Sequence, residues 1–146
     1  MITQEGIEFI KRHEGFSPLP YLCSAGKETI GYGHVIKHGE QFPCGVTEQQ
    51  AEEILLDDVA EAEQCIFDCV EVNLMPFQFD ALVSLIFNIG TNAFSKSTLL
   101  RMLNTEQYEE AGKQFLRWVY ADGKVVYGLQ KRRQEEKRLF DGGLYD

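Results

Sequence analysis

Three residues near the start of the chain carry side chains that can do chemistry. Glu14 lies in the segment HEGF, and Cys23 and Thr29 lie in the segment CSAGKETIGYGH. A carboxyl group can act as a general acid when its surroundings raise its pKa. A thiol can be a nucleophile, a metal ligand or an inert apolar group, and a threonine is common in strands. Taken one at a time, these residues do not decide between structure and chemistry.

The segment GYGH contains two alternating glycines followed by His34. It lacks the GxGxxG spacing and the following helix of a dinucleotide-binding loop. Alternating glycines in a strand are more typical of a bulge or of a close backbone approach. No second histidine stands at metal-binding spacing in a suitable element, so the sequence predicts neither a metal nor another cofactor.

The composition predicts one folded domain of ordinary apolar content, with 44% hydrophobic residues among 146. No run of eighteen uncharged apolar residues is present, and the first fifteen residues lack the apolar core of a secretory signal. Four cysteines, Cys23, Cys44, Cys65 and Cys69, are too few and too unevenly spaced for a disulfide framework. We therefore expect synthesis in a reducing compartment.

The formal net charge of −9 is unevenly distributed. Residues 1–73 hold 4 basic and 14 acidic side chains, whereas residues 74–146 hold 10 basic and 9 acidic ones. The acidic half argues against nucleic acid as a partner. Arg132 and Arg133 belong to the one basic cluster, KRRQEEKR. Their default interpretation is a solvated helix face, and the alternative is an arginine that faces Glu14 or an anionic substrate.

The hydrophobic periodicity predicts several helices and one small antiparallel sheet. The sheet is expected within residues 16–45, where prolines and glycines separate short β-prone pieces. Thr47 and Gln50 form a predicted capping box at the start of a long helix. A turn is expected at 121–124. The chain is expected to form two lobes, and the second lobe, from about residue 74 onward, is expected to be all helix. The predicted helices span residues 3–13, 47–70, 77–89, 97–103, 107–119 and 129–140.

Five ordered blocks together resemble one family, the phage-type lysozymes, which are muramidases of glycoside hydrolase family 24 and include T-even and lambdoid phage endolysins. The blocks are HEGF, CSAGKETIGYGH, VTEQQAEEILLDDV, FDALVSLIFNIGTNAFSKSTLL and GLQKRRQEEKRLF. The family's catalytic pattern is glutamate, eight residues, aspartate or cysteine, five residues and threonine. Glu14, Cys23 and Thr29 match that pattern without a gap.

The resemblance implies an α+β, two-lobed lysozyme-like fold in a single domain over residues 1–146. The sheet lobe would cover about 14–46 and the connecting helix about 47–70. The helical lobe would cover about 74–146 and include the helix at 3–13.

The implied activity is hydrolysis of the β-1,4 bond between N-acetylmuramic acid and N-acetylglucosamine in peptidoglycan, with inversion. Glu14 would protonate the leaving oxygen. Thr29 would hold a water, and Cys23 would assist that water or stabilise the transition state. His34, Asn88 and either Arg132 or Arg133 would bind substrate or support the site, the arginine by an ion pair with the catalytic glutamate.

Cys23 departs from the aspartate variant of the family pattern. A thiol with an ordinary pKa of ~8.5 is largely neutral at pH 7, and we expect a neighbouring carboxylate to raise that pKa further. A disulfide between Cys23 and Cys44 is a further hypothesis, and it would make the activity redox sensitive.

The expected role is that of an endolysin, held in the host cytoplasm and released to the wall through a membrane lesion made by a separate holin. We expect a monomer whose partner is peptidoglycan, with no stable membrane association. One alternative is a wall-binding or virion structural protein with little activity. Another is a lytic transglycosylase, which needs no water opposite the acid.

Overall fold

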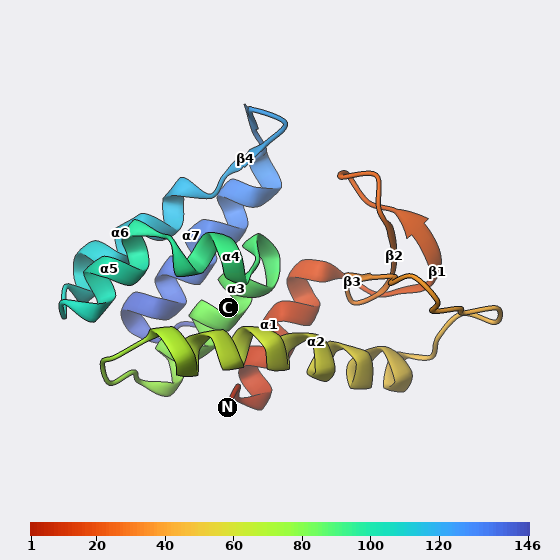
Figure 1. Cartoon of the computed structure of the whole chain (residues 1–146), viewed down its shortest axis with the longest axis horizontal. Helices are drawn as coiled ribbons and strands as arrows, with labels where there is room; N and C mark the ends of the chain where they lie inside the picture. The colour runs from red at the N-terminus through yellow and green to blue at the C-terminus, as the bar shows by residue number, and fades with distance from the viewer. The chain divides into compact units, whose positions relative to one another are not determined.

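The computed structural model describes all 146 residues and contains both helices and short antiparallel strands. The chain divides into two compact units. We call Ile10–Ala60 the sheet unit, and Met1–Phe9 with Glu61–Asp146 the helical unit. The division falls within two helices, α1 (Gln4–Glu14) and α2 (Glu48–Cys69), which are labelled in Figure 1. The mixed helix and sheet composition agrees with the predicted α+β class.

The sheet unit contains three antiparallel strands in the order β1–β2–β3. They are β1 (Ser17–Leu22), β2 (Glu28–Gly31) and β3 (His34–Val35). Tyr21 lies opposite Thr29 across β1 and β2, and the register shifts between Ser17 and Tyr21. The predicted antiparallel sheet within residues 16–45 is confirmed.

The long helix α2 begins where the capping box predicts. The Thr47 backbone N–H donates to the Gln50 side-chain oxygen at 2.9 Å, and the Gln50 N–H donates to the Thr47 hydroxyl at 3.1 Å. Two N–H groups that have no partner within the helix are thereby satisfied. At the other end, the Asn104 amide donates to the Cys69 carbonyl at 2.9 Å and so satisfies an acceptor that has no partner within the helix. The predicted range of 47–70 is correct to within one residue at each end.

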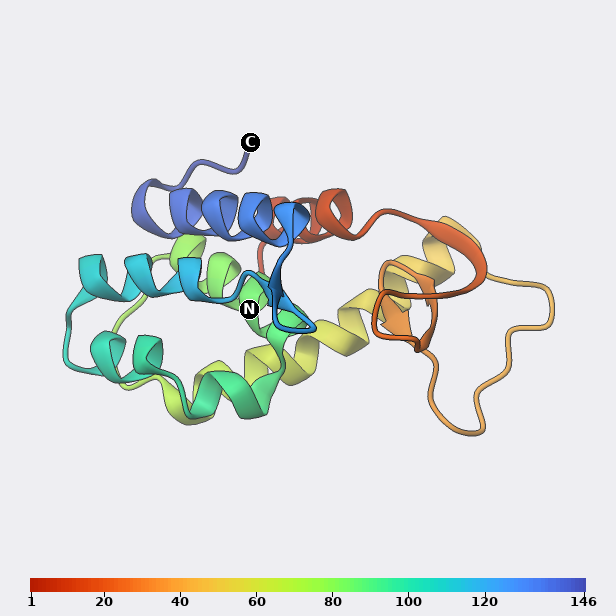
Figure 2. The same ribbon diagram turned by 90° about the horizontal axis from the view of Figure 1, so that it is seen from above.

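The helical unit is built around α3 (Pro76–Ile89), which packs mainly against α7 (Tyr127–Gly142). Residues 79–86 of α3 are all buried, as its almost continuous apolar sequence predicts. The two helices lie in neighbouring layers in Figure 2. The remaining helices are α4 (Thr91–Ser95), α5 (Thr98–Asn104), α6 (Tyr108–Gln114) and the 3₁₀ helix η1 (Phe115–Arg117).

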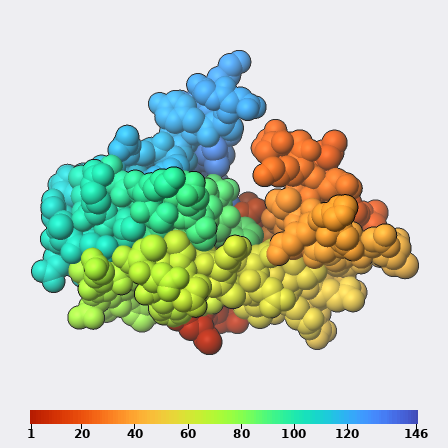
Figure 3. All heavy atoms as spheres, in the orientation of Figure 1, coloured from red at the N-terminus to blue at the C-terminus, as the bar shows by residue number.

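The prediction that the second lobe is all helix is wrong. Strands β4 (Tyr120–Ala121) and β5 (Lys124–Val125) form a hairpin, so the helix predicted for 107–119 already ends at Arg117. Asp122 and Gly123 both have positive φ, at 51° and 75°, as a two-residue hairpin turn requires. The hairpin protrudes from the helices of its own unit in Figure 3, at the top of the view. The turn itself was predicted, and the strands on either side of it were missed.

A buried carboxylate joins the two ends of the chain within the helical unit. Asp80 is 1% exposed and accepts hydrogen bonds from the Thr3 backbone N–H at 3.0 Å, from the Thr3 hydroxyl and from the Tyr145 hydroxyl at 2.6 Å. Burial, together with this bond to Asp80, raises the pKa of Tyr145 to about 12. The Tyr145 hydroxyl therefore stays protonated and remains a donor. None of the helices combines the length and the apolar character needed to cross a membrane.

Candidate active site

Glu14 is the last residue of α1, and the backbone at Gly33 lies close to its carboxyl group. Gly15 ends the helix with φ of 70°, and its N–H donates to the Lys11 carbonyl at 2.8 Å. A Cβ atom at Gly33 would lie 2.9 Å from the carboxyl carbon of Glu14. The glycine at position 33 therefore lets the backbone approach the Glu14 side chain directly.

Cys23 lies in the tight turn between β1 and β2. Its N–H donates to the Lys27 carbonyl at 3.0 Å, and its carbonyl accepts from the Gly26 N–H at 2.8 Å. Hydrogen bonds from the Lys27 N–H, the Ala25 N–H and the Thr29 hydroxyl stabilise the thiolate and lower the pKa of Cys23. The expectation of a raised pKa is therefore wrong, because donors in the turn outweigh burial at this sulfur.

Thr29 is buried in β2, with 3% of its surface exposed. Its hydroxyl has one hydrogen, which can be donated to the Lys27 carbonyl at 3.1 Å or to the Cys23 thiolate. Its lone pairs can still accept a hydrogen bond from a third group. The structure thus brings the side chains of Cys23 and Thr29 together.

Tyr21 is a residue of this site that the sequence interpretation missed. It lies opposite Thr29 in the sheet and is 40% exposed. Its pKa is raised by burial and then by the negative charges of Glu14 and Cys23, so these three side chains share one electrostatic neighbourhood. The signal that was available is its position two residues before Cys23, within the region where the sheet is predicted.

His34 lies in the same unit but faces two carboxylates. It is 5% exposed, with Nδ1 at 2.7 Å from Asp58 Oδ2 and Nε2 at 3.0 Å from Glu40 Oε1. The bond with Asp58, followed by the bond with Glu40, raises the pKa of His34 against the opposing effect of burial. The imidazole thereby connects β3 to α2 and to the loop that contains Glu40.

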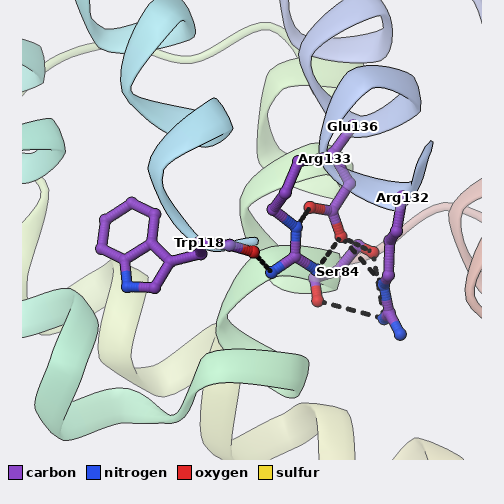
Figure 4. Close-up of polar contacts among 5 residues, drawn as sticks. All are labelled: Ser84, Trp118, Arg132, Arg133 and Glu136. Carbon is purple, nitrogen blue, oxygen red and sulfur yellow. Dashed lines mark hydrogen bonds and ion pairs between the residues drawn. The ribbon is translucent and has the colours of Figure 1, made fainter. Parts of the chain in front are cut away.

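Arg132 and Arg133 lie in the helical unit, and their default interpretation as a solvated face is wrong. They are 6% and 0% exposed, and both contact the fully buried carboxylate of Glu136 (Figure 4). Arg133 Nε lies 2.8 Å from Glu136 Oε1, and Arg132 Nε lies 3.2 Å from Glu136 Oε2. The Ser84 hydroxyl donates to the same carboxylate at 2.5 Å. Arg132 and Arg133 precede Glu136 by four and three residues, so all three side chains lie on the same, buried face of α7.

The set drawn in Figure 4 contains two guanidinium groups and one carboxylate, which is a net charge of +1. Trp118 adds only a backbone carbonyl, which accepts from Arg133 at 3.5 Å. Since guanidinium groups do not lose their proton in proteins, both arginines stay positively charged at every working pH. The helical unit therefore holds two permanent cations at this place.

The other predicted residues have simpler surroundings. Asn88 is exposed near the end of helix α3. All four cysteines are free thiols, and no disulfide joins Cys23 to Cys44. Cys65 is buried, and burial raises its pKa to about 11.

A family model for phage lysozyme matches residues 11–136 of this chain. The chain belongs to the phage lysozyme family. An endolysin of Acyrthosiphon pisum secondary endosymbiont phage 1 is 42% identical over 144 residues, which cover 96% of this chain and 97% of that protein.

Two solved structures carry the same fold as this phage lysozyme. An endolysin from Escherichia coli O157:H7 phage FAHEc1 superposes with a TM-score of 0.91 and 30% identity, over 100% of this chain and 96% of that one. The muramidase domain of SpmX from Asticaccaulis excentricus superposes with a TM-score of 0.87 and 34% identity, over 97% of each chain. The protein is a glycoside hydrolase that acts on bacterial peptidoglycan.

Proposed function

We propose that this phage lysozyme cleaves the β-1,4 bond between N-acetylmuramic acid and N-acetylglucosamine with inversion, and that Glu14 is the general acid. The gathering of Glu14, Cys23 and Thr29 in the sheet unit carries this proposal. Glu14 protonates the oxygen of the leaving sugar, which lowers the barrier to breaking the glycosidic bond. The close approach of Gly33 supports this role because it limits the positions of the carboxyl group.

Cys23 and Thr29 then act on the water that attacks the opposite face of the sugar. The lowered pKa of Cys23 supports a thiolate, which can accept a proton from that water or face the developing positive charge. The Thr29 hydroxyl positions the same water by accepting one of its hydrogens. A neutral thiol would do this less well, so the donors in the turn compensate for the missing aspartate.

Arg132 or Arg133 supplies the positive charge that holds the catalytic carboxylate in place. Their match to the family's basic position near the catalytic glutamate supports this role. Asn88 is exposed and carries both an amide donor and an acceptor, which suits a sugar or peptide amide. His34 supports the site indirectly by holding β3 against α2.

The biological role that we infer is host cell lysis by a monomeric endolysin. The protein would accumulate in the host cytoplasm and reach the wall through a lesion made by a separate holin. The endolysin relatives support this role.

Product analysis with one variant tests the chemistry. Purified peptidoglycan is digested with the wild type and with Glu14→Gln, and the products are identified by mass and by the anomeric configuration of the new reducing ends. We expect α-configured reducing muramic ends from the wild type and a loss of about 10²–10⁴ in rate for the variant. Retained activity in Glu14→Gln would refute the role of Glu14. Anhydro ends would indicate a transglycosylase, β-configured ends would indicate retention, and no product would indicate a binding role.

A further inference from the structure

The catalytic glutamate is bordered by a turn that is itself tightly held. Tyr32 and Gly33 form the turn between β2 and β3, and Gly33 lies directly against the carboxyl group of Glu14. Gly33 has φ of 78°, a conformation that residues with a side chain rarely adopt. A shift of this turn would therefore change the space that is open to the Glu14 carboxyl group.

Tyr32 is held between two groups that flank Glu14 in the sequence. The Lys11 amino group lies 5.3 Å from the centre of the Tyr32 ring, which is cation–π geometry. The Phe16 ring lies 5.5 Å from the same ring at an interplanar angle of 46°. Lys11 comes three residues before Glu14 and Phe16 two residues after it. The ring is 8% exposed, so these contacts are largely shielded from water.

Lys11 is in turn anchored to α2. Its amino group forms an ion pair with the Glu52 carboxylate, and the two side chains are 18% and 36% exposed. Residues three apart on a helix face the same side, so Lys11 and Glu14 belong to one face of α1. Lys11 therefore ties three elements together one turn before the catalytic residue: α1, α2 and the β2–β3 turn.

We propose that Tyr32 and Lys11 are positioning residues, which press the Gly33 backbone against Glu14 and so fix the carboxyl group in its productive orientation. This inference rests on the proposed role of Glu14 as the general acid. It assigns a function to two side chains outside the glutamate, cysteine and threonine pattern. Misplacement of a catalytic group by about 1 Å costs up to about 100-fold in rate, so such contacts have a measurable effect.

The test separates turnover from substrate binding in four variants. Tyr32→Leu removes the ring, and Lys11→Met keeps the stem but removes the charge. Both should lower kcat on soluble glycan strands by about 10- to 100-fold, with less than about a twofold change in KM. Tyr32→Phe and Lys11→Arg keep the ring and the cation, and both should restore kcat to within about threefold of the wild type.

A stability control excludes a general effect of loosened packing. Leu103→Val shortens a fully buried side chain in the helical unit, away from these contacts. At a temperature where urea titration shows every variant to be folded, the control should keep its kcat. The inference is overturned if folded Tyr32→Leu keeps wild-type kcat, or if its loss equals that of a control of the same stability.

The Glu14→Gln variant in the same assay distinguishes an error in the positioning role from an error in the proposed function. If Glu14→Gln is inactive while Tyr32→Leu turns over normally, the positioning role alone is wrong. If Glu14→Gln retains activity, the proposed acid is wrong, and the positioning role falls with it. The double variant Tyr32→Leu with Glu14→Gln should have the same kcat as Glu14→Gln alone. The position of residue 14 no longer affects the rate once its side chain cannot donate a proton.

Discussion

Each of the two units contains a cluster of charged side chains around a buried residue, and the two clusters are opposite in composition. In the helical unit, Arg132 and Arg133 share the carboxylate of Glu136. In the sheet unit, His34 alone lies between the carboxylates of Asp58 and Glu40. The first cluster has more cations than anions, and the second has more anions than cations.

The cations of the two clusters differ in whether they can lose a proton near neutral pH. Guanidinium groups remain protonated at every working pH, so the arginine cluster keeps its charge. The imidazole titrates near neutral pH, so the cross-link made by the histidine cluster varies in strength. The arginine cluster therefore keeps its cations at any working pH, whereas the histidine cluster can lose its cation.

The largest expected effect comes from removing the shared anion of the arginine cluster. Glu136→Gln removes the carboxylate that two buried guanidinium groups share and should lower the free energy of unfolding by about 3–5 kcal/mol. Urea titration by circular dichroism measures this change. The triple replacement of Arg132, Arg133 and Glu136 by Met removes all three charges and should recover part of the loss. A Glu136→Gln variant as stable as the wild type would show that the carboxylate does not balance the arginines.

The histidine cluster should give a smaller effect that depends on pH. Because the pKa of His34 is raised in the folded state, its contribution is complete below the ordinary value of ~6.5 and is lost as the pH rises through the folded value. His34→Asn should therefore cost about 1.5–3 kcal/mol at pH 5.5 and less at pH 9. Urea titrations of both proteins across this range measure the difference. A cost that is independent of pH would refute the charged cross-link.

Cys23 adds a third kind of charged group to the comparison, a thiolate that is stabilised mainly by hydrogen bonds from backbone N–H groups. Iodoacetamide should alkylate Cys23 with a pH midpoint below that of an ordinary thiol, and alkylation should abolish lysis. Thr29→Val removes one donor and should raise the midpoint, but not fully, because the Lys27 and Ala25 N–H groups are still present. Peptide mass mapping follows the modified residue. A midpoint at or above that of a simple thiol would contradict a stabilised thiolate.

The smallest effect is expected at a pair that water surrounds. Lys113 and Glu110 are 3.1 Å apart with side chains 54% and 49% exposed. Solvent screens such pairs, so Lys113→Met should leave the urea midpoint unchanged within error, with and without 0.5 M salt. A loss as large as that of His34→Asn would show that burial is not what separates the clusters.

The sequence predicted those features that depend on local spacing. The capping box of Thr47 and Gln50 needs only residues three apart, and it was found where expected. The β4–β5 hairpin was missed because its strands have two residues each, which is too short for a period-two pattern.

The features that sequence could not predict depend on contacts between distant residues. The burial of Arg132 and Arg133 requires Ser84, which lies 48 residues from Arg132, and a carboxylate on the inner face of α7. The lowered pKa of Cys23 depends on where the N–H groups of a turn point, which residue types do not show. The support of Glu14 by Tyr32 likewise depends on contacts across the sheet unit, which only the fold reveals.

The carboxylate of Asp80 binds residues from both ends of the chain, Thr3 and Tyr145. A short peptide linker should therefore be able to join the two ends without disturbing the helices, and new ends could be opened at the exposed Asp122–Gly123 turn. Such a circular permutant would place α1 and α7 in one continuous stretch of sequence. Fusion partners could then be attached at the new ends, in the β4–β5 turn.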